Sequence, residues 1–353
     1  MLKSLLIYGL KLGGIIMKVK KIIALLLSMS MLAGMSVSSF ADDGLTIGSS
    51  DEIKVVNFEN GIETYEEYAT QTLQDVDLPG RAASSVLPES EGIDPESYQH
   101  FEEADLLKDD GSFNWEAYAE LPTLDEEIDT YSVIGKDDRV AVTNTDEAPY
   151  CYTAYLLMSY INKDGTKSSY RGTGFVAGEN MVVTCGHNIY SHDVNRAGWA
   201  NSVTIILQKN GNVEPWTTTK SRLRSNSGWT QKEQKESDWG IIETTKNLAD
   251  YVGYGVIASP STNIVGKVVE IPGYPKVVKN ETNSYKMWTD TGTVSRQDSN
   301  GRIHYDVDTS GGNSGSGVFI NGSTAVAVHA YGGTLNSGAR IAGLLYNLIM
   351  EYR

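Results

Sequence analysis

From about residue 132 onward, the chain shows short apolar runs separated by Gly, Asn and Asp residues. Runs of this length and spacing are typical of the strands of a sandwich or a pair of barrels. The abundance of glycine (35 residues) and tyrosine (20 residues) favours the same turn-rich, strand-rich class. The expected strands cover residues 150–161, 174–177, 181–184, 203–207, 268–271, 303–307, 318–320 and 325–328.

Two turn signals and a change of period complete this pattern. Asp164-Gly165 and Asn321-Gly322 are dipeptides that favour tight hairpins, and the second pair lies between two expected strands. Near the end, apolar residues recur at helical spacing, which predicts a closing C-terminal helix. The residues that carry this helical pattern are Ile341, Leu344, Leu345, Leu348 and Ile349.

Residues 42–131 differ from this in charge and in texture. They hold 25 acidic residues against three basic ones, whereas residues 132–353 carry a net charge of +1. The asymmetry indicates a separate acidic unit, which we interpret as a pro-region; the alternative is a disordered acidic linker. Within it, the aromatic patches at residues 65–68 and 113–118 could form short helices or bind a partner.

The first 41 residues have the composition of an export signal. Lys18, Lys20 and Lys21 precede an apolar stretch at residues 22–37, and small residues at 39–41 suit a signal peptidase. We therefore expect residues 1–41 to be a signal peptide whose true start is Met17. The alternative, an uncleaved membrane anchor, is disfavoured because a spanning helix needs about 20 apolar residues.

Cysteine usage and charge exclude several function classes. Cys151 and Cys185 are the two cysteines, and they could form one disulfide or remain as two buried thiols. No Cys-x-x-Cys pattern or Cys/His cluster in the sequence suggests a metal, so we expect no metal and no cofactor. The sequence has no basic patch that would indicate nucleic-acid binding, so we expect no nucleic-acid partner.

The segment GGNSGSG at residues 311–317 is the first candidate for chemistry. Glycines around Ser314 allow a sharp turn that exposes its hydroxyl group, and Gly312 can aim its N–H toward the same point as the N–H of Ser314. Two such donors would form an oxyanion hole. The alternative is a flexible Gly/Ser loop. A G-x-S-x-G elbow is absent because residue 316 is serine, which argues against an α/β-hydrolase.

Two further motifs supply a candidate base and its orienting acid. His187 follows an apolar strand and small residues, and Asp238 precedes the apolar residues 239–242. Either residue alone could be structural, and His192 is a local competitor that we expect in a solvated loop. Together, His187, Asp238 and Ser314 follow the order of chymotrypsin-type enzymes, with separations of 51 and 76 residues.

From residue 132 to the end, the chain resembles the glutamyl endopeptidases of Gram-positive bacteria. The resemblance rests on residues 132–145, which are similar to mature starts of bacillary members, on the histidine motif at 184–190, the aspartate motif at 238–243 and the serine motif at 308–316. The strand at residues 327–333 resembles the one that lines the specificity pocket. In departures from the family, Gly317 replaces a proline, and Asn188 replaces a cysteine that often follows the histidine.

The resemblance implies an all-β, chymotrypsin-like double six-stranded β-barrel with a C-terminal helix, occupying residues 132–353. The triad would lie between the barrels. Ser314 would attack a peptide carbonyl, His187 would transfer the proton and Asp238 would orient His187. The N–H groups of Gly312 and Ser314 would hold the oxyanion.

The family resemblance also implies cleavage after glutamate, with Thr309 and His329 contacting that carboxylate. We therefore expect a secreted, monomeric serine endopeptidase that acts on proteins or peptides and is not membrane-associated once its signal is removed. The alternatives are a protease of Asp or broad specificity on the same fold, and a catalytically silent secreted binding protein. Esterase activity is a possible side reaction, because acyl transfer to serine is shared.

Overall fold

The computed structural model of the chain describes most of the predicted protease domain and a few segments before it. The described residues are 133–353 except 197, 210, 211, 218–221, 245 and 284, together with 108, 114, 121–124 and the strand backbones of 52–57 and 62–67. The predicted signal peptide at residues 1–41 lies outside this set, as do the cleavage sites expected after Ala41 and residue 131. No helix among these described residues is long and apolar enough to cross a membrane.

One sheet has nine strands and is built mainly from residues 153–243. Its order is β10-β9-β4-β5-β6-β12-β11-β1-β2. Its interior strand β4 is buried along nearly all its length, in keeping with its largely apolar sequence. The strands are β1 Glu52–Asn57, β2 Ile62–Glu67, β4 Thr153–Ile161, β5 Lys167–Gly178, β6 Met181–Thr184, β9 Ser202–Lys209, β10 Asn212–Thr217, β11 Arg222–Asn226 and β12 Gly240–Glu243.

A second sheet has seven strands and closes on itself. Its order is β13-β21-β20-β14-β18-β19-β22, and an additional pairing of β21 with β22 joins six of these strands into a ring. It therefore forms a β-barrel to which β13 is added as a parallel strand. The strands are β13 Val256–Ile257, β14 Val268–Glu270, β18 Thr291–Gln297, β19 Arg302–Tyr305, β20 Gly317–Ile320, β21 Thr324–Tyr331 and β22 Asn336–Arg340.

Short elements connect and cover the two sheets. The minor strands are β3 Val140–Ala141, β7 Tyr190–Ser191, β8 Gly198–Trp199, β15 Val277–Val278, β16 Glu281–Thr282 and β17 Trp288–Thr289. The helices are η4 Tyr150–Tyr152, α3 Gly186–Ile189, α4 Ser227–Thr230, η5 Lys235–Ser237, α5 Ala249–Val252 and α6 Gly343–Tyr352.

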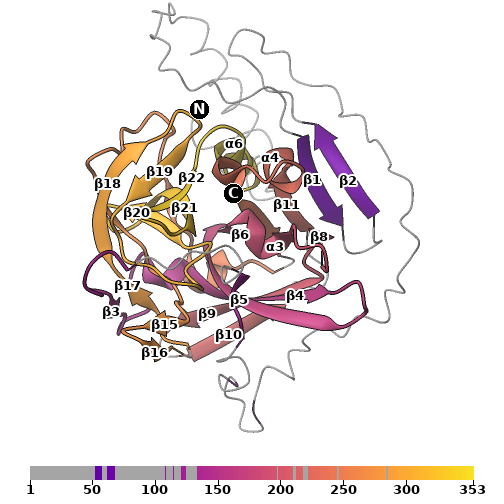
Figure 1. The fold of residues 1–353 in the computed structure, drawn as a ribbon, viewed down its shortest axis with the longest axis horizontal. Coiled ribbons are helices and arrows are strands. Elements are labelled where there is room, and N and C mark those ends of the chain that lie inside the picture. The colour runs from indigo at the N-terminus through magenta and orange to yellow at the C-terminus, as the bar shows by residue number, and fades with distance from the viewer. Residues whose placement is uncertain are drawn as a thin grey trace, which may run out of the picture. The chain divides into compact units, whose positions relative to one another are not determined.

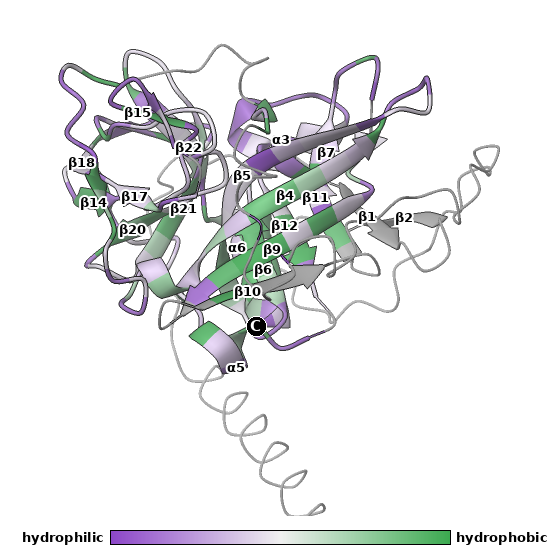
Figure 2. Cartoon of the chain, turned by 90° about the horizontal axis from the view of Figure 1, so that it is seen from below, coloured by the Kyte–Doolittle hydropathy of each residue, from purple (hydrophilic) through white to green (hydrophobic). Residues whose placement is uncertain are grey.

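The two sheets share one apolar cluster at their junction. In Figure 1 the second sheet, coloured orange to yellow, lies beside the magenta strands of the first. Phe175 of β5 meets Phe319 of β20 edge to face, with ring centroids 5.6 Å apart. Leu345 and Leu348 of α6 belong to the same cluster. Figure 2 shows mostly hydrophobic colouring along the middle of β4 and β9, where the first sheet has its own core.

Most sequence predictions of elements are confirmed, with three corrections. The expected strand at residues 150–161 begins with the helical turn η4, because the carbonyl of Tyr150 accepts a bond from Thr153. Residues 62–67 form β2 instead of part of a short helix, and pair with β1. In the two sheets, strands β1, β10, β11, β13, β18 and β22 were not expected. Both hairpins are present, and Asn321 and Gly322 adopt the positive φ of 52° and 74° that such a turn requires.

Candidate active site

Strand register places the candidate base and acid at the same end of the first sheet. β6 and β12 are antiparallel neighbours in which Thr184 lies opposite Gly240. The chain therefore leaves β6 and enters β12 at the same edge, with His187 three residues after Thr184 and Asp238 two residues before Gly240. Gly186 permits this approach, because a Cβ there would lie 2.9 Å from Asp238 Oδ1.

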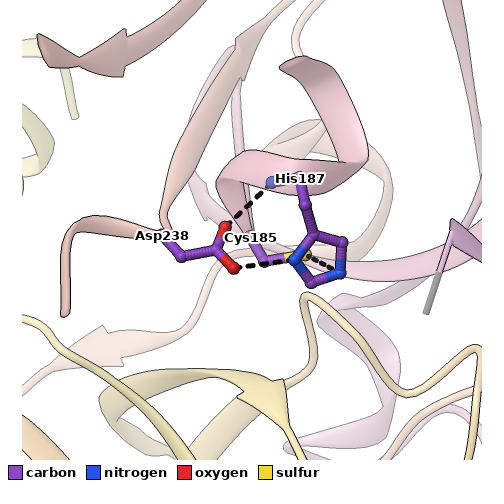
Figure 3. A group of neighbouring side chains, drawn as sticks. All are labelled: Cys185, His187 and Asp238. Atoms are coloured by element: carbon purple, nitrogen blue, oxygen red, sulfur yellow. Dashed lines mark hydrogen bonds and ion pairs between the residues drawn. The ribbon is translucent and has the colours of Figure 1, made fainter. Parts of the chain in front are cut away.

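His187 and Asp238 form a buried pair that is joined by two hydrogen bonds. Asp238 Oδ2 lies 2.7 Å from His187 Nδ1, and Oδ1 accepts the backbone N–H of His187 at 2.8 Å. Both contacts are drawn in Figure 3. Asp238 is fully buried and His187 is 3% exposed. The carboxylate thus fixes both the position and the ring orientation of the imidazole.

A tyrosine from the second sheet also contacts this carboxylate. The side chain of Tyr331 hydrogen-bonds to Asp238, and its ring centroid lies 6.1 Å from that of His187. Burial, followed by the negative charge of Asp238 and this hydrogen bond, raises the pKa of Tyr331 well above its usual value. The hydroxyl group therefore stays protonated and serves as a donor.

Glycine conformation shapes the loop that carries Ser314, between β19 and β20. Gly312 and Gly315 have φ of +96° and +91°, values that L side chains rarely adopt. A Cβ at Gly315 would also collide with the carbonyl oxygen of Thr173 on β5. The glycines predicted to allow a sharp turn therefore do so at two specific positions.

Hydrogen bonds from the first sheet hold the backbone of Ser314. Its carbonyl oxygen accepts the N–H of Thr173 and the side-chain amide of Asn188, both at 2.9 Å. Asn188 lies next to His187 on α3. This short helix therefore carries His187 and also binds the backbone of Ser314. The Ser314 hydroxyl donates to the carbonyl of Ala330 at 3.4 Å. Among the described hydrogen bonds, none joins Ser314 to His187.

A docked segment from the start of the predicted mature domain supports the same loop. Asp308 accepts the backbone N–H groups of Ile134 and Asp138, at 2.7 and 3.1 Å. Arg139 donates to the hydroxyl of Ser310 at 2.7 Å and forms an ion pair with Asp137, also at 2.7 Å. Residues 134–139 therefore hold in place the chain segment that leads to Ser314.

Comparisons with known proteins match this architecture. Residues 172–328 match the family model of the trypsin-like peptidase domain. An extracellular metalloprotease of Bacillus subtilis is 33% identical over 245 residues, covering 67% of this chain and 75% of the relative. A glutamyl endopeptidase of Bacillus licheniformis is 31% identical over 235 residues, covering 63% of this chain and 69% of the relative.

The chain belongs to the glutamyl endopeptidase family of chymotrypsin-like serine endopeptidases. Within the solved structures, one of a Glu endopeptidase in complex with MPD is 26% identical. It covers 63% of this chain and 98% of its own, with a TM-score of 0.49. The predicted family, fold class and serine endopeptidase activity are confirmed by the sequence matches.

The endopeptidase buries both residues that were expected to contact glutamate. Thr309 is 1% exposed and lies five residues before Ser314, and His329 on β21 is 3% exposed. His329 Nδ1 lies 2.7 Å from the hydroxyl of Tyr305 on β19, a partner that the sequence reading missed. Burial raises the pKa of Tyr305 well above its usual value, so this hydroxyl group also remains protonated.

The competing histidine and the two cysteines are also placed. His192 lies in a loop, as expected, but it is half-buried there and its Nε2 contacts the carbonyl of Trp229 at 2.9 Å. Cys151 and Cys185 are not joined by a disulfide; Cys185 is buried, whereas Cys151 is half-buried. Cys185 Sγ lies 3.3 Å from His187 Nε2. Cys185, His187 and Asp238 are a buried group of residue types that can hold a metal ion.

Three residues of the endopeptidase's site were not assigned a role from the sequence. Tyr305 and Tyr331 lie on strands, where the sequence pattern predicts ordinary core positions. Asn188 was noted only as a departure from the family motif. An inward-facing alternation of residues 303, 305 and 307 was the available signal for Tyr305. For Tyr331 the signal was misleading, because β21 has a register shift between His329 and Tyr331.

Proposed function

We propose that Ser314, His187 and Asp238 form the catalytic triad of this serine endopeptidase. The supporting observation is the buried pair in which Asp238 holds both the Nδ1 atom and the backbone N–H of His187. A second support is the amide of Asn188, which ties the backbone of Ser314 to the helix that carries His187.

In this mechanism Ser314 Oγ attacks the peptide carbonyl carbon and passes its proton to His187 Nε2. His187 then gives the proton to the leaving amine, and water repeats the sequence to release the acyl group. Asp238 stabilises the imidazolium, while the N–H groups of Gly312 and Ser314 hold the oxyanion. The Ser314 hydroxyl group must turn from the carbonyl of Ala330 toward His187 Nε2. The hydrogen bond between a catalytic serine and its base often tightens only when substrate is present.

The extracellular metalloprotease of Bacillus subtilis suggests by its name a metal-dependent alternative, and the Cys185–His187–Asp238 group gives it a physical basis. We favour the serine mechanism because both carboxylate oxygens of Asp238 already accept hydrogen bonds from His187. A catalytic zinc site also usually has three protein ligands and an open position. Under the serine mechanism a chelator leaves the activity unchanged.

A fluorophosphonate probe tests the nucleophile. We expect the probe to label the protein at Ser314, as mapped by peptide mass spectrometry, and to abolish cleavage of casein. The variant Ser314→Ala should retain its fold and lose about a millionfold in kcat. Labelling at another serine, or casein cleavage by repurified Ser314→Ala near the wild-type rate, would contradict the assignment.

We further propose that the enzyme cleaves after glutamate. In this proposal the Tyr305 hydroxyl group donates to Nδ1 of His329, so that the imidazole proton resides on Nε2 and can be donated to a substrate carboxylate. The hydroxyl group of Thr309 is the second donor. Glutamine fits such a pocket poorly because its amide group leaves one of these donors unpaired.

The variants His329→Ala and Tyr305→Phe test this pocket. His329→Ala should reduce kcat/KM for a Glu substrate far more than it reduces acylation by a small unspecific ester. Tyr305→Phe should shift the Glu-to-Gln preference in the same direction but by a smaller factor. Equal losses on both substrates would mean that these residues support the fold instead of recognising the side chain.

We propose, finally, that the enzyme is made as an exported precursor with a signal peptide at residues 1–41 and a pro-region at 42–131. It would then be secreted as a monomer that acts on protein or peptide substrates. Supporting this, the pro-region segment 121–124 contacts β5 near the site: Arg171 donates its N–H to the carbonyl of Pro122 at 3.0 Å. Arg171 is two residues before Thr173, which binds Ser314. In this proposal the segment restricts substrate access to Ser314.

Expression from residue 42, with and without Ser314→Ala, tests the precursor. We expect the unprocessed protein to be weakly active on a Glu substrate and the wild type to trim itself after Glu127, before another protease cuts near residue 131. N-terminal sequencing of both products provides the measurement. Full activity of the unprocessed wild type contradicts inhibition, and equal trimming of Ser314→Ala contradicts self-processing.

A further inference from the structure

Cys185 is a buried thiol that the proposed mechanism does not use. It follows β6 directly, two residues before His187, and its side chain belongs to the apolar cluster between the two sheets. In Figure 3 its sulfur atom lies behind the imidazole ring of His187, and a dashed line joins it to that ring. Its Sγ atom lies 3.3 Å from Nε2, the nitrogen that must receive the proton of Ser314.

This pair of atoms has the chemistry of a site for a soft cation. Thiolate and imidazole are the ligands that zinc, cadmium and mercury prefer. Metal–sulfur and metal–nitrogen bonds of about 2.3 and 2.0 Å span a gap of this size around one ion. Asp238, bound to the other ring nitrogen, stands where the supporting carboxylate of a metal-bound histidine is usually found.

We propose that Cys185 Sγ and His187 Nε2 form an inhibitory binding site for one soft divalent cation of the zinc, cadmium and mercury class. On binding, the thiol proton is released to solvent and the ion takes the lone pair of Nε2. Water molecules complete the coordination. The ion therefore removes the general base, so the inhibition rests on the proposed triad, whereas the binding itself does not.

A cadmium titration of Ser314→Ala, expressed from residue 42, measures binding without catalysis or self-digestion. We expect one equivalent of Cd²⁺ to produce the ultraviolet charge-transfer band of a cadmium–thiolate bond. Cys185→Ala in this background should abolish the band, while Cys151→Ala, the matched control at the other cysteine, should retain it. Asp238→Asn should weaken binding about 10- to 100-fold, through loss of the supporting carboxylate.

The same ion should inhibit the active enzyme. We expect Cd²⁺ to lower the rate on a Glu substrate and a chelator to restore it. Cys185→Ala should remain active and need at least about tenfold more Cd²⁺ for half inhibition, whereas Cys151→Ala should respond like the wild type. Cys185→Ser, of nearly the same size, replaces Cys185→Ala if circular dichroism shows that the alanine variant is misfolded.

Three outcomes would overturn the site: a thiolate band that persists in the Cys185 variants, a band lost in Cys151→Ala, or equal cadmium sensitivity of all variants. A different result separates the proposed function from this inference. If the fluorophosphonate probe does not label Ser314 but the cadmium band depends on Cys185, the triad assignment fails and the binding site stands.

Discussion

The two sides of the candidate site are held in place by different kinds of structure. On the first sheet, the pairing of Thr184 with Gly240 in adjacent strands brings His187 and Asp238 to one edge. On the second sheet, Ser314 lies in a loop that depends on two positive-φ glycines and on donors from Thr173 and Asn188. One side is fixed by regular strand register, and the other by individual contacts between the sheets.

This difference teaches where the site is sensitive. A substitution at the His187–Asp238 pair alters chemistry on a scaffold that remains paired, so its main effect should be on kcat. A substitution that removes an inter-sheet contact allows the serine loop to move relative to the base, and misplacement of about 1 Å can cost about 100-fold in rate.

Among the substitutions that test this comparison, Asp238→Asn should have the largest effect. The amide group can no longer accept from Nδ1 and from the backbone N–H in the same way, so the imidazole takes the wrong tautomer. We expect kcat to fall about 10⁴-fold with little change in KM or in thermal unfolding. A loss of less than tenfold would show that the register-fixed pair is not the catalytic base and its support.

Tyr331→Phe removes a hydroxyl contact that the second sheet makes with this pair. A hydrogen bond to a charged group is worth about 1.5–3 kcal/mol, so we expect kcat to fall about 10- to 100-fold. The pH–rate profile, measured in parallel, should show a higher pKa for the base, because the Asp238 carboxylate without its hydroxyl donor attracts the imidazolium proton more strongly. Unchanged kcat with reduced stability would assign Tyr331 to packing alone.

Asn188→Ala tests the link between the two sides. It removes the amide that donates to Ser314 O, and we expect about a tenfold loss of kcat with KM nearly unchanged. Serine labelling by the fluorophosphonate should slow by the same factor, since both reactions need Ser314 aligned with His187. A loss confined to KM would contradict this role.

The smallest expected effect concerns the ion pair that supports the serine loop from outside. The side-chain hydrogen bond from Arg139 lowers the pKa of Asp137 from 3.8 to about 2. The carboxylate therefore contributes stability that is present above about pH 3.8 and is lost as the pH falls through about 2. Asp137→Asn should lower the free energy of unfolding by about 1 kcal/mol or less at neutral pH. The variant's thermal unfolding temperature should also fall less steeply at acidic pH than that of the wild type.

The sequence determined the strands, the hairpins and the order of the three catalytic candidates. Apolar runs and Gly-containing turns predict strands because backbone sterics and burial act locally, and Asn321-Gly322 shows this at its clearest. The motifs around His187, Asp238 and Ser314 gave the family because their small neighbours are needed for close approach. The pocket candidates Thr309 and His329 also came from motif resemblance, and their role stays a prediction.

Tertiary structure alone decided which side chains support those residues. Tyr331 reaches Asp238 across two sheets, and a register shift in β21 makes its direction unreadable from alternation. The contacts of Tyr305 with His329 and of Cys185 with Nε2 likewise depend on where two chain segments meet in space. The sequence pattern predicts each strand from local preferences. These side-chain contacts form only when the two sheets pack against each other and exclude water from the side chains between them.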